Sequence, residues 1–167
     1  MHATLKLTKR IQEIADAAYD DHGDICNGYD EHQIAAGCFR VVFIENGVAI
    51  KLARFTRYAS YNRKEWDMYR KFPKSVKAIT TKPICISKCG RVMAIELVAT
   101  TLGKRARDTG EGSEPDRHEF NARLKKLLTE SGLFKRDETL NLLSDNHPGN
   151  IGVRENGELV WIDFAGC

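Results

Sequence analysis

Two carboxylates and one amide in the last part of the sequence have the types and spacing of a site for a divalent cation. Asp145 and Asn150 bracket a tight Pro-Gly loop, and Asp163 follows thirteen residues after Asn150 at the end of an apolar run. Oxygen ligands without Cys or His suit Mg²⁺ that is bridged to phosphates. The alternative is a turn that uses Asp, Asn, Pro and Gly only for their turn geometry. Because the acid–amide–acid order is demanding, we favour the cation site.

Lys51 could supply a positive charge for a phosphate group. In the run 48–52, alternation places Ala49 and Lys51 on one face of a strand and three apolar residues on the other. A lysine beside a small alanine on an interior face could contact a phosphate, while the alanine leaves room for a flat ring. The alternative is an exposed lysine on the solvent face of the strand.

Glu65 lies in the middle of the apolar stripe of a predicted helix. Its neighbours at offsets of −7, −4, +3, +4 and +7 are aromatic or apolar, namely Tyr58, Tyr61, Met68, Tyr69 and Phe72. Burial of a lone carboxylate costs several kcal/mol unless a cation meets it, and Lys51 is the natural candidate. If the stripe is instead rotated toward Trp66, Glu65 points to water.

Gly37 stands immediately before the lysine hairpin, in the segment 35–42. It would permit the close backbone approach that a phosphate-cradling loop needs. A single glycine is also compatible with the ordinary start of a strand. Arg40, at the tip of this segment, is expected either to touch phosphate or to be solvated.

Hydrophobic periodicity predicts the elements that must position these residues. Helical spacing indicates helices over residues 4–21, 56–72 and 116–130, whereas strand texture indicates hairpins over 41–52 and 83–98 and around 155–157. Residues 21–30 and 144–150 are predicted loops, and the polar segment 100–115 is the predicted boundary between two lobes. The order of these elements predicts an α+β arrangement with a cleft at the hinge.

Composition restricts the class of protein. The chain has 167 residues, and its 42% hydrophobic and 29% charged residues are ordinary for a soluble globular protein. No apolar run approaches the about 20 residues of a membrane helix, so we expect a cytoplasmic protein without a membrane partner. The five cysteines are an odd number without framework spacing, which indicates reduced thiols. The basic stretch 104–107 is short and lacks interleaved aromatics, so it indicates a solvated loop rather than a nucleic-acid site.

Taken in order, these residues resemble the protein-kinase-like superfamily. The run 49–51 is similar to the third-strand V-A-I-K, Glu65 to the glutamate of the following helix, and the segment 94–98 to the hinge that hydrogen-bonds adenine. The segment 145–150 has the five-residue step of the catalytic loop, and Asp163-Phe164 stands where the metal-binding D-F-G belongs. The wording Asp-x-His-Pro-Gly-Asn is closer to aminoglycoside- and lipid-kinase-like members, and to small bacteriophage-encoded kinase-like proteins, than to eukaryotic protein kinases.

The resemblance implies a bilobal fold. It assigns residues 1–32 to an N-terminal helical extension, 33–98 to an antiparallel-sheet N-lobe and 99–167 to a truncated C-lobe. The sequence departs from the family in four places. The glycine loop keeps only its middle glycine, with Ala35 and Arg40 in the other two positions, and Leu143-Ser144 replaces the His-Arg before Asp145. D-F-G becomes Asp163-Phe164-Ala165-Gly166, and the chain ends at Cys167, where the family has its activation segment and substrate platform.

The resemblance implies an ATP-dependent phosphotransferase that uses Mg²⁺, with Asp145 and Lys51 as catalytic residues and Asn150 and Asp163 as metal ligands. The implied ATP-binding residues are Gly37, Phe39, Ala49, Lys51, Glu65, Glu96 and Val98. The acceptor is expected to be a hydroxyl, either of a protein Ser or Thr or of a small molecule. The alternative is a pseudokinase that acts by binding a partner or a second copy through its C-lobe, such as a phage-encoded host-takeover or anti-defence factor acting in the host cytoplasm.

Overall fold

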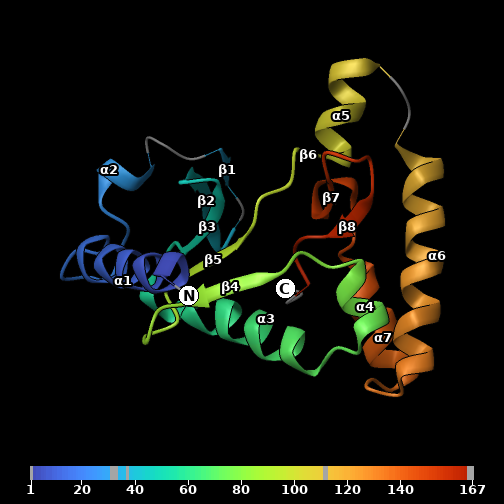
Figure 1. Ribbon diagram of the computed structural model, residues 1–167, viewed down its shortest axis with the longest axis horizontal. Helices are drawn as coiled ribbons and strands as arrows, with labels where there is room; N and C mark the ends of the chain where they lie inside the picture. Colours follow the sequence, from blue (N-terminus) through green and yellow to red (C-terminus); the bar gives the residue numbers. More distant parts are fainter. Residues whose placement is uncertain (1, 31–33, 37, 111–112, 165–167) are drawn as a thin grey trace. The chain divides into compact units, whose positions relative to one another are not determined.

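The computed structural model describes residues 2–30, 34–36, 38–110 and 113–164, and it confirms the α+β class (Figure 1). The chain divides into two compact units, and the division falls within one helix and again after Leu97. Unit 1 lies within residues 1–67 and 82–97, and unit 2 within residues 68–81 and 98–167. In the described part of the chain, no helix combines the length and the apolar character needed to cross a membrane.

Unit 1 is built on a five-stranded antiparallel sheet with the strand order β1-β2-β3-β5-β4. The strands are β1 (Ala35–Ala36), β2 (Arg40–Glu45), β3 (Val48–Ala53), β4 (Pro83–Ile86) and β5 (Val92–Glu96). The turn between β2 and β3 is Asn46-Gly47, and both residues have positive φ, of 51° and 76°. A two-residue turn of this kind matches the twist of the paired strands, so the expected hairpin is confirmed.

The two faces of this sheet are covered by different helices. Helix α1 (His2–Ala17) packs against β4 and β5, and its buried residues share a core with Ile50 and Leu52 of β3. On the other face, Ala49 joins a smaller cluster that includes Trp66 of helix α3 (Ala59–Lys71). The expected alternation in β3 is confirmed, because a strand sends successive side chains to opposite faces.

The described residues of unit 2 combine four α-helices, besides the end of α3, with a three-stranded antiparallel sheet in the order β6-β7-β8. The helices are α4 (Lys74–Ala78), α5 (Leu102–Thr109), α6 (Glu114–Ser131) and α7 (Arg136–Ser144). The strands are β6 (Thr100–Thr101), β7 (Ile151–Val153) and β8 (Leu159–Trp161), so the expected last hairpin is confirmed. Buried residues of α6 pack with β7, β8 and Phe164 in one apolar core.

The polar segment 100–115 is not the irregular hinge that its composition predicted. Most of it forms β6 and helix α5, so the basic stretch 104–107 lies on a helix rather than in a loop. The Thr101 hydroxyl accepts the Lys104 backbone N–H at 3.1 Å, and the left-handed Gly110 (φ 73°) ends the helix. A cap at each end stabilises this short helix. Because the helix has few apolar residues, hydrophobic periodicity did not predict it.

Two further boundaries differ from expectation. The N-terminal helix ends at Ala17 rather than near residue 21, since the chain turns back there and Tyr19 bridges to Ile25. The predicted loop 21–30 contains the short helix α2 (Asn27–Asp30), and η1 (Thr56–Tyr58) precedes α3. Residues 136–144, which carried no expected element, form α7.

Candidate functional site

Lys51 and Glu65 form a buried ion pair in unit 1. Lys51 Nζ lies 2.5 Å from Glu65 Oε1, and the two residues are only 4% and 0% exposed. Strand β3 sends Lys51 to the sheet face covered by α3, and Glu65 lies on the side of α3 that faces that strand. The expectation that Lys51 neutralises a buried Glu65 is confirmed, and the exposed alternatives for both residues are wrong. A buried carboxylate requires such a partner because desolvation penalises its charge.

Arg40 shares the same carboxylate, which corrects the expectation that it touches phosphate or is solvated. Its Nη1 lies 2.6 Å from Glu65 Oε2, and the residue is 8% exposed. In the β2–β3 register Val42 pairs with Lys51. Arg40 is two residues from Val42 and therefore lies on the same face of the sheet as Lys51. Glu65 thus uses one oxygen for each of two cations.

Asn62, one turn before Glu65 on α3, ties this cluster to the backbone. Its side-chain amide donates to the carbonyls of Gly90 and Arg91 at 3.1 and 3.0 Å, and its Oδ1 accepts from Arg40 at 3.4 Å. The residue is fully buried. Sequence reasoning missed it, although a polar residue three positions before Glu65 on the apolar side of a helix was the available signal.

The remaining residues expected to bind ATP have mixed placements. Gly37 lies outside the described residues, and Ala49 is buried on the face that Lys51 shares. Phe39 stacks on Tyr61 with ring centroids 4.5 Å apart, so it packs against α3. Glu96 accepts the Lys82 backbone N–H at 3.1 Å through its carboxylate. Val98 belongs to unit 2, where it lies close to Gly152 of β7.

In unit 2, hydrogen bonds close the loop that carries Asp145 and Asn150. The Asn150 side-chain amide donates to the Asp145 carbonyl at 2.8 Å, and the His147 backbone N–H donates to the same carbonyl at 2.9 Å. Residues Pro148–Asn150 form the short helix η2. Because Asn150 Nδ2 is engaged inside the loop, its Oδ1 is the atom suited to a cation. This bond joins the Asn150 side chain to the Asp145 backbone, so the expected convergence of the two side chains stays a prediction.

Asp163 follows β8 at a position fixed by its neighbours. The Ile162 N–H donates to the Asn150 carbonyl at 3.0 Å, which brings the Asp163 segment beside the loop. Phe164 is fully buried, with its ring centroid 5.4 Å from that of Trp161. Asp163 is therefore held between two anchored residues, with Asn150 on the adjacent segment.

This donor set fits Mg²⁺ by its chemistry, because carboxylate and amide oxygens are hard ligands. Among the described residues, no three His, Cys, Asp or Glu side chains lie together in a way that could hold a metal ion. The expected set has only two carboxylates and one amide, and it is completed in such sites by water and phosphate oxygens.

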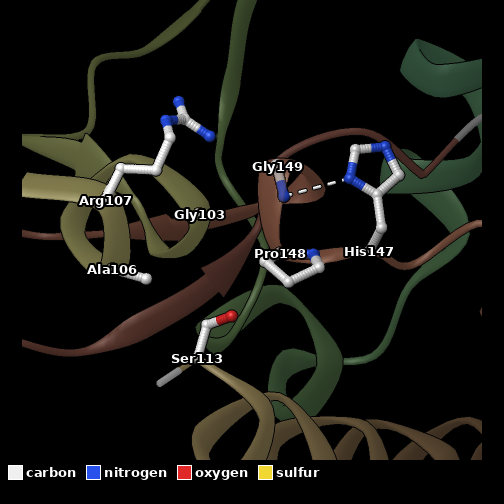
Figure 2. A pocket seen from close by; sticks show the side chains of 7 residues that line it. All are labelled: Gly103, Ala106, Arg107, Ser113, His147, Pro148 and Gly149. Atoms are coloured by element: carbon white, nitrogen blue, oxygen red, sulfur yellow. Dashed lines mark hydrogen bonds between the residues drawn. The ribbon is translucent and has the colours of Figure 1, made fainter. Parts of the chain in front are cut away.

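His147 is folded back onto its own loop. Its Nδ1 accepts the Gly149 N–H at 3.0 Å, as Figure 2 shows. A Cβ at position 149 would lie 2.7 Å from His147 Cε1, so only glycine lets the ring lie this close. Because Nδ1 is an acceptor, the ring proton lies on Nε2, which becomes a donor directed away from the loop.

Comparison of the chain with models of known protein families and with curated proteins gives no match.

Proposed function

We propose that this protein is an ATP-dependent phosphotransferase that moves the γ-phosphoryl group of Mg-ATP to a Ser or Thr hydroxyl of a protein. The observation that carries the proposal is the buried Lys51–Glu65 pair on β3 and α3. A lysine ammonium is a compact cation that binds phosphate, and a buried counter-ion fixes its position. The kinase-like bilobal fold is part of this proposal.

In unit 1, Lys51 would bind the α- and β-phosphates while Glu65 holds its ammonium. Ala49, buried on the same face, would set only a small side chain against the adenine ring. Phosphoryl transfer depends mainly on positioning and on charge stabilisation, so the fixed ammonium is the main contribution of this unit.

In unit 2, Asn150 and Asp163 would bind Mg²⁺ through their side-chain oxygens. The bound ion neutralises phosphate charge that would otherwise repel an incoming oxygen. Asp145 would accept the proton of the acceptor hydroxyl as its oxygen attacks the γ-phosphorus. The bond between the γ-phosphorus and the bridging oxygen breaks, so the products are ADP, a phosphoester and a proton held by Asp145.

A second candidate is a pseudokinase that binds a partner without transferring phosphate. The observation that favours it is at the start of β2, where Arg40 stands in place of a glycine of the family's loop and is ion-paired with Glu65. Because Arg40 is buried and bound to Glu65, the loop before β2 has fewer conformations available for covering a nucleotide.

Transfer of labelled γ-phosphate to a mixture of acceptor proteins, or to the chain itself, tests the proposal. Wild type should incorporate label, whereas Lys51→Met and Asp163→Asn should lose activity by orders of magnitude, because each removes one essential charge. Lys64→Ala, an exposed lysine on the same helix as Glu65, serves as the control and should keep the activity.

A thermal-shift measurement with ATP and Mg²⁺ separates the two candidates. Stabilisation of wild type but not of Asp163→Asn would support a nucleotide site, since a ligand that binds only the folded state raises its stability. Equal incorporation of label by all variants would exclude the assignment, and nucleotide binding without incorporation would favour the pseudokinase.

A further inference from the structure

Unit 2 contains a pocket between helix α5 and the loop that follows Asp145. Its volume is about 540 Å³, and it is open to solvent rather than enclosed. Figure 2 shows α5 on one side and the His147–Gly149 loop on the other. The lining residues are Gly103, Ala106, Arg107, Ser113, His147, Pro148 and Gly149.

One wall of the pocket is fixed to the proposed catalytic residue. The His147 N–H and the Asn150 side chain both donate to the Asp145 carbonyl, at 2.9 and 2.8 Å. Gly149 donates to His147 Nδ1. Any molecule that occupies this pocket therefore touches a loop whose first residue is Asp145.

The other wall is a capped helix in close contact with the loop. A Cβ at Gly103 would meet Pro148 and the Gly149 nitrogen at 3.4 Å, so α5 and η2 already lie at van der Waals distance. Arg105, on the same helix, pairs with Asp116 of α6, whereas Arg107 lines the pocket. The Arg105 guanidinium is thus engaged in an ion pair with α6, whereas the Arg107 side chain remains part of the pocket wall.

The charge of the pocket selects its ligand. Among the described residues that line it, none is acidic, and the polar groups are the Arg107 guanidinium, the His147 ring and the Ser113 hydroxyl. An arginine fork matches the two oxygens of a carboxylate. The His147 ring adds no second donor beside Arg107, because its Nδ1 accepts the Gly149 N–H and its other nitrogen lies on the far side of the ring (Figure 2). An anionic group fits this set, and a cationic group would be repelled by Arg107.

We propose that this pocket binds acidic side chains of a protein substrate, so that the enzyme selects Ser or Thr residues with Asp or Glu nearby. The selection of Ser or Thr residues rests on the proposed phosphotransferase function, since Asp145 must act on the selected hydroxyl. The binding of acidic side chains does not. An open depression suits a segment of polypeptide that lies across the surface, whereas a small metabolite is usually enclosed on most sides.

Fluorescence anisotropy with three labelled peptides tests the pocket without any catalysis. Each peptide has a central serine, flanked by two glutamates, two alanines or two lysines on each side. The acidic peptide should bind the full-length protein about tenfold more tightly than the alanine peptide, as expected for hydrogen bonds to a charged partner. Arg107→Glu should reverse this preference in favour of the lysine peptide.

Lys104→Glu is the matched control, because Lys104 is an exposed residue of the same helix that does not line the pocket. It changes the net charge by the same amount and should retain the acidic preference. Equal binding of the three peptides, or an equal effect of the two variants, would overturn the proposal. Full displacement of the acidic peptide by inorganic phosphate at a similar concentration would also overturn it, because the pocket would then bind any small anion.

The proposed function fails separately from the pocket. If the acidic peptide binds through Arg107 but no label is transferred to it, the pocket is a docking site and the phosphotransferase assignment is wrong. If label is transferred without regard to acidic residues, the phosphotransferase assignment stands and the pocket proposal is wrong.

Discussion

Arg40 donates to Glu65 Oε2 at 2.6 Å, from the strand next to the one that carries Lys51. The carboxylate would therefore stay ion-paired if Lys51 turned to a phosphate. The Glu65 carboxylate is therefore neutralised by two cations. A glutamate is rarely fully buried unless it is paired in this way. This pairing makes Arg40 a positioning residue for Lys51 within the proposed mechanism.

Removal of the shared carboxylate should cost more stability than removal of either cation. Glu65→Ala takes away the group that holds both Arg40 and Lys51, and the loss of one member of a buried charged network costs about 3–5 kcal/mol. Arg40→Ala leaves the Lys51–Glu65 pair in place and should cost less. Urea unfolding followed by circular dichroism measures both values.

Glu130→Ala is the control for this comparison, because Glu130 forms an exposed i,i+4 pair with Lys126. Such pairs contribute about 0.5 kcal/mol or less. If Glu65→Ala and Glu130→Ala have the same free energy of unfolding, the buried pairing does not stabilise the fold.

Tyr19 should make the protein less stable in alkali. Burial raises the pKa of Tyr19 above its ordinary value, and the hydroxyl donates to the Ala53 carbonyl at 2.7 Å, which requires the protonated form. Since the folded pKa is the higher one, the stabilisation is complete below about pH 10, the usual tyrosine value, and is lost as the pH rises toward the folded pKa.

Tyr19→Phe should lose about 1 kcal/mol at neutral pH and should show a weaker fall of stability above pH 10 than wild type. Chemical unfolding at a series of pH values measures this difference. Tyr29→Phe, a half-buried tyrosine of the same unit, is the control. A pH dependence identical in wild type and Tyr19→Phe would contradict the prediction.

Asn150 should tolerate neither alanine nor aspartate. Its side chain donates to the Asp145 carbonyl, so Asn150→Asp removes the donor and sets a carboxylate against a carbonyl oxygen. We expect a loss of about 1 kcal/mol or more in the unfolding free energy, and a higher Mg²⁺ concentration for half-maximal transfer with Asn150→Ala.

Asn156→Asp provides the contrast, because a carboxylate still accepts the Glu158 N–H at 3.1 Å and loses only an exposed hydrogen bond to the Glu158 carboxylate. Thermal denaturation of both variants decides the point. Equal melting temperatures for Asn150→Asp and Asn156→Asp would show that the loop does not depend on the amide donor.

Gly152 of β7 should not tolerate a larger side chain. A Cβ at this position would lie 2.6 Å from Ile162 Cγ2 and 2.8 Å from Val98 Cγ1 inside the core of unit 2. Gly152→Ala should therefore cost about 1–3 kcal/mol by overpacking. Gly103→Ala, whose Cβ would meet its neighbours at 3.4 Å, should be neutral or stabilising within α5. Calorimetry measures the melting temperature of each variant, and Gly152→Ala should have the lower value. Equal melting temperatures would contradict the overpacking argument.

Sequence patterns predicted the elements that depend on local chemistry. The Asn46-Gly47 turn, the alternation in β3 and the stop of α3 before Pro73 follow from turn geometry, period two and a missing backbone N–H. The Lys51–Glu65 pair was also predictable, because burial of Glu65 demanded a cation and Lys51 lay on the interior face of the preceding strand.

Tertiary structure decided which further groups join them. Arg40 becomes a second partner of Glu65 only through the β2–β3 register, and Asn62 joins only because α3 covers that face of the sheet. Likewise, α5 has few apolar residues, so its helical state depends on end caps and on contact with η2 rather than on a hydrophobic stripe. Periodicity reports the face on which a side chain lies, whereas the partner that it meets there depends on how distant segments pack.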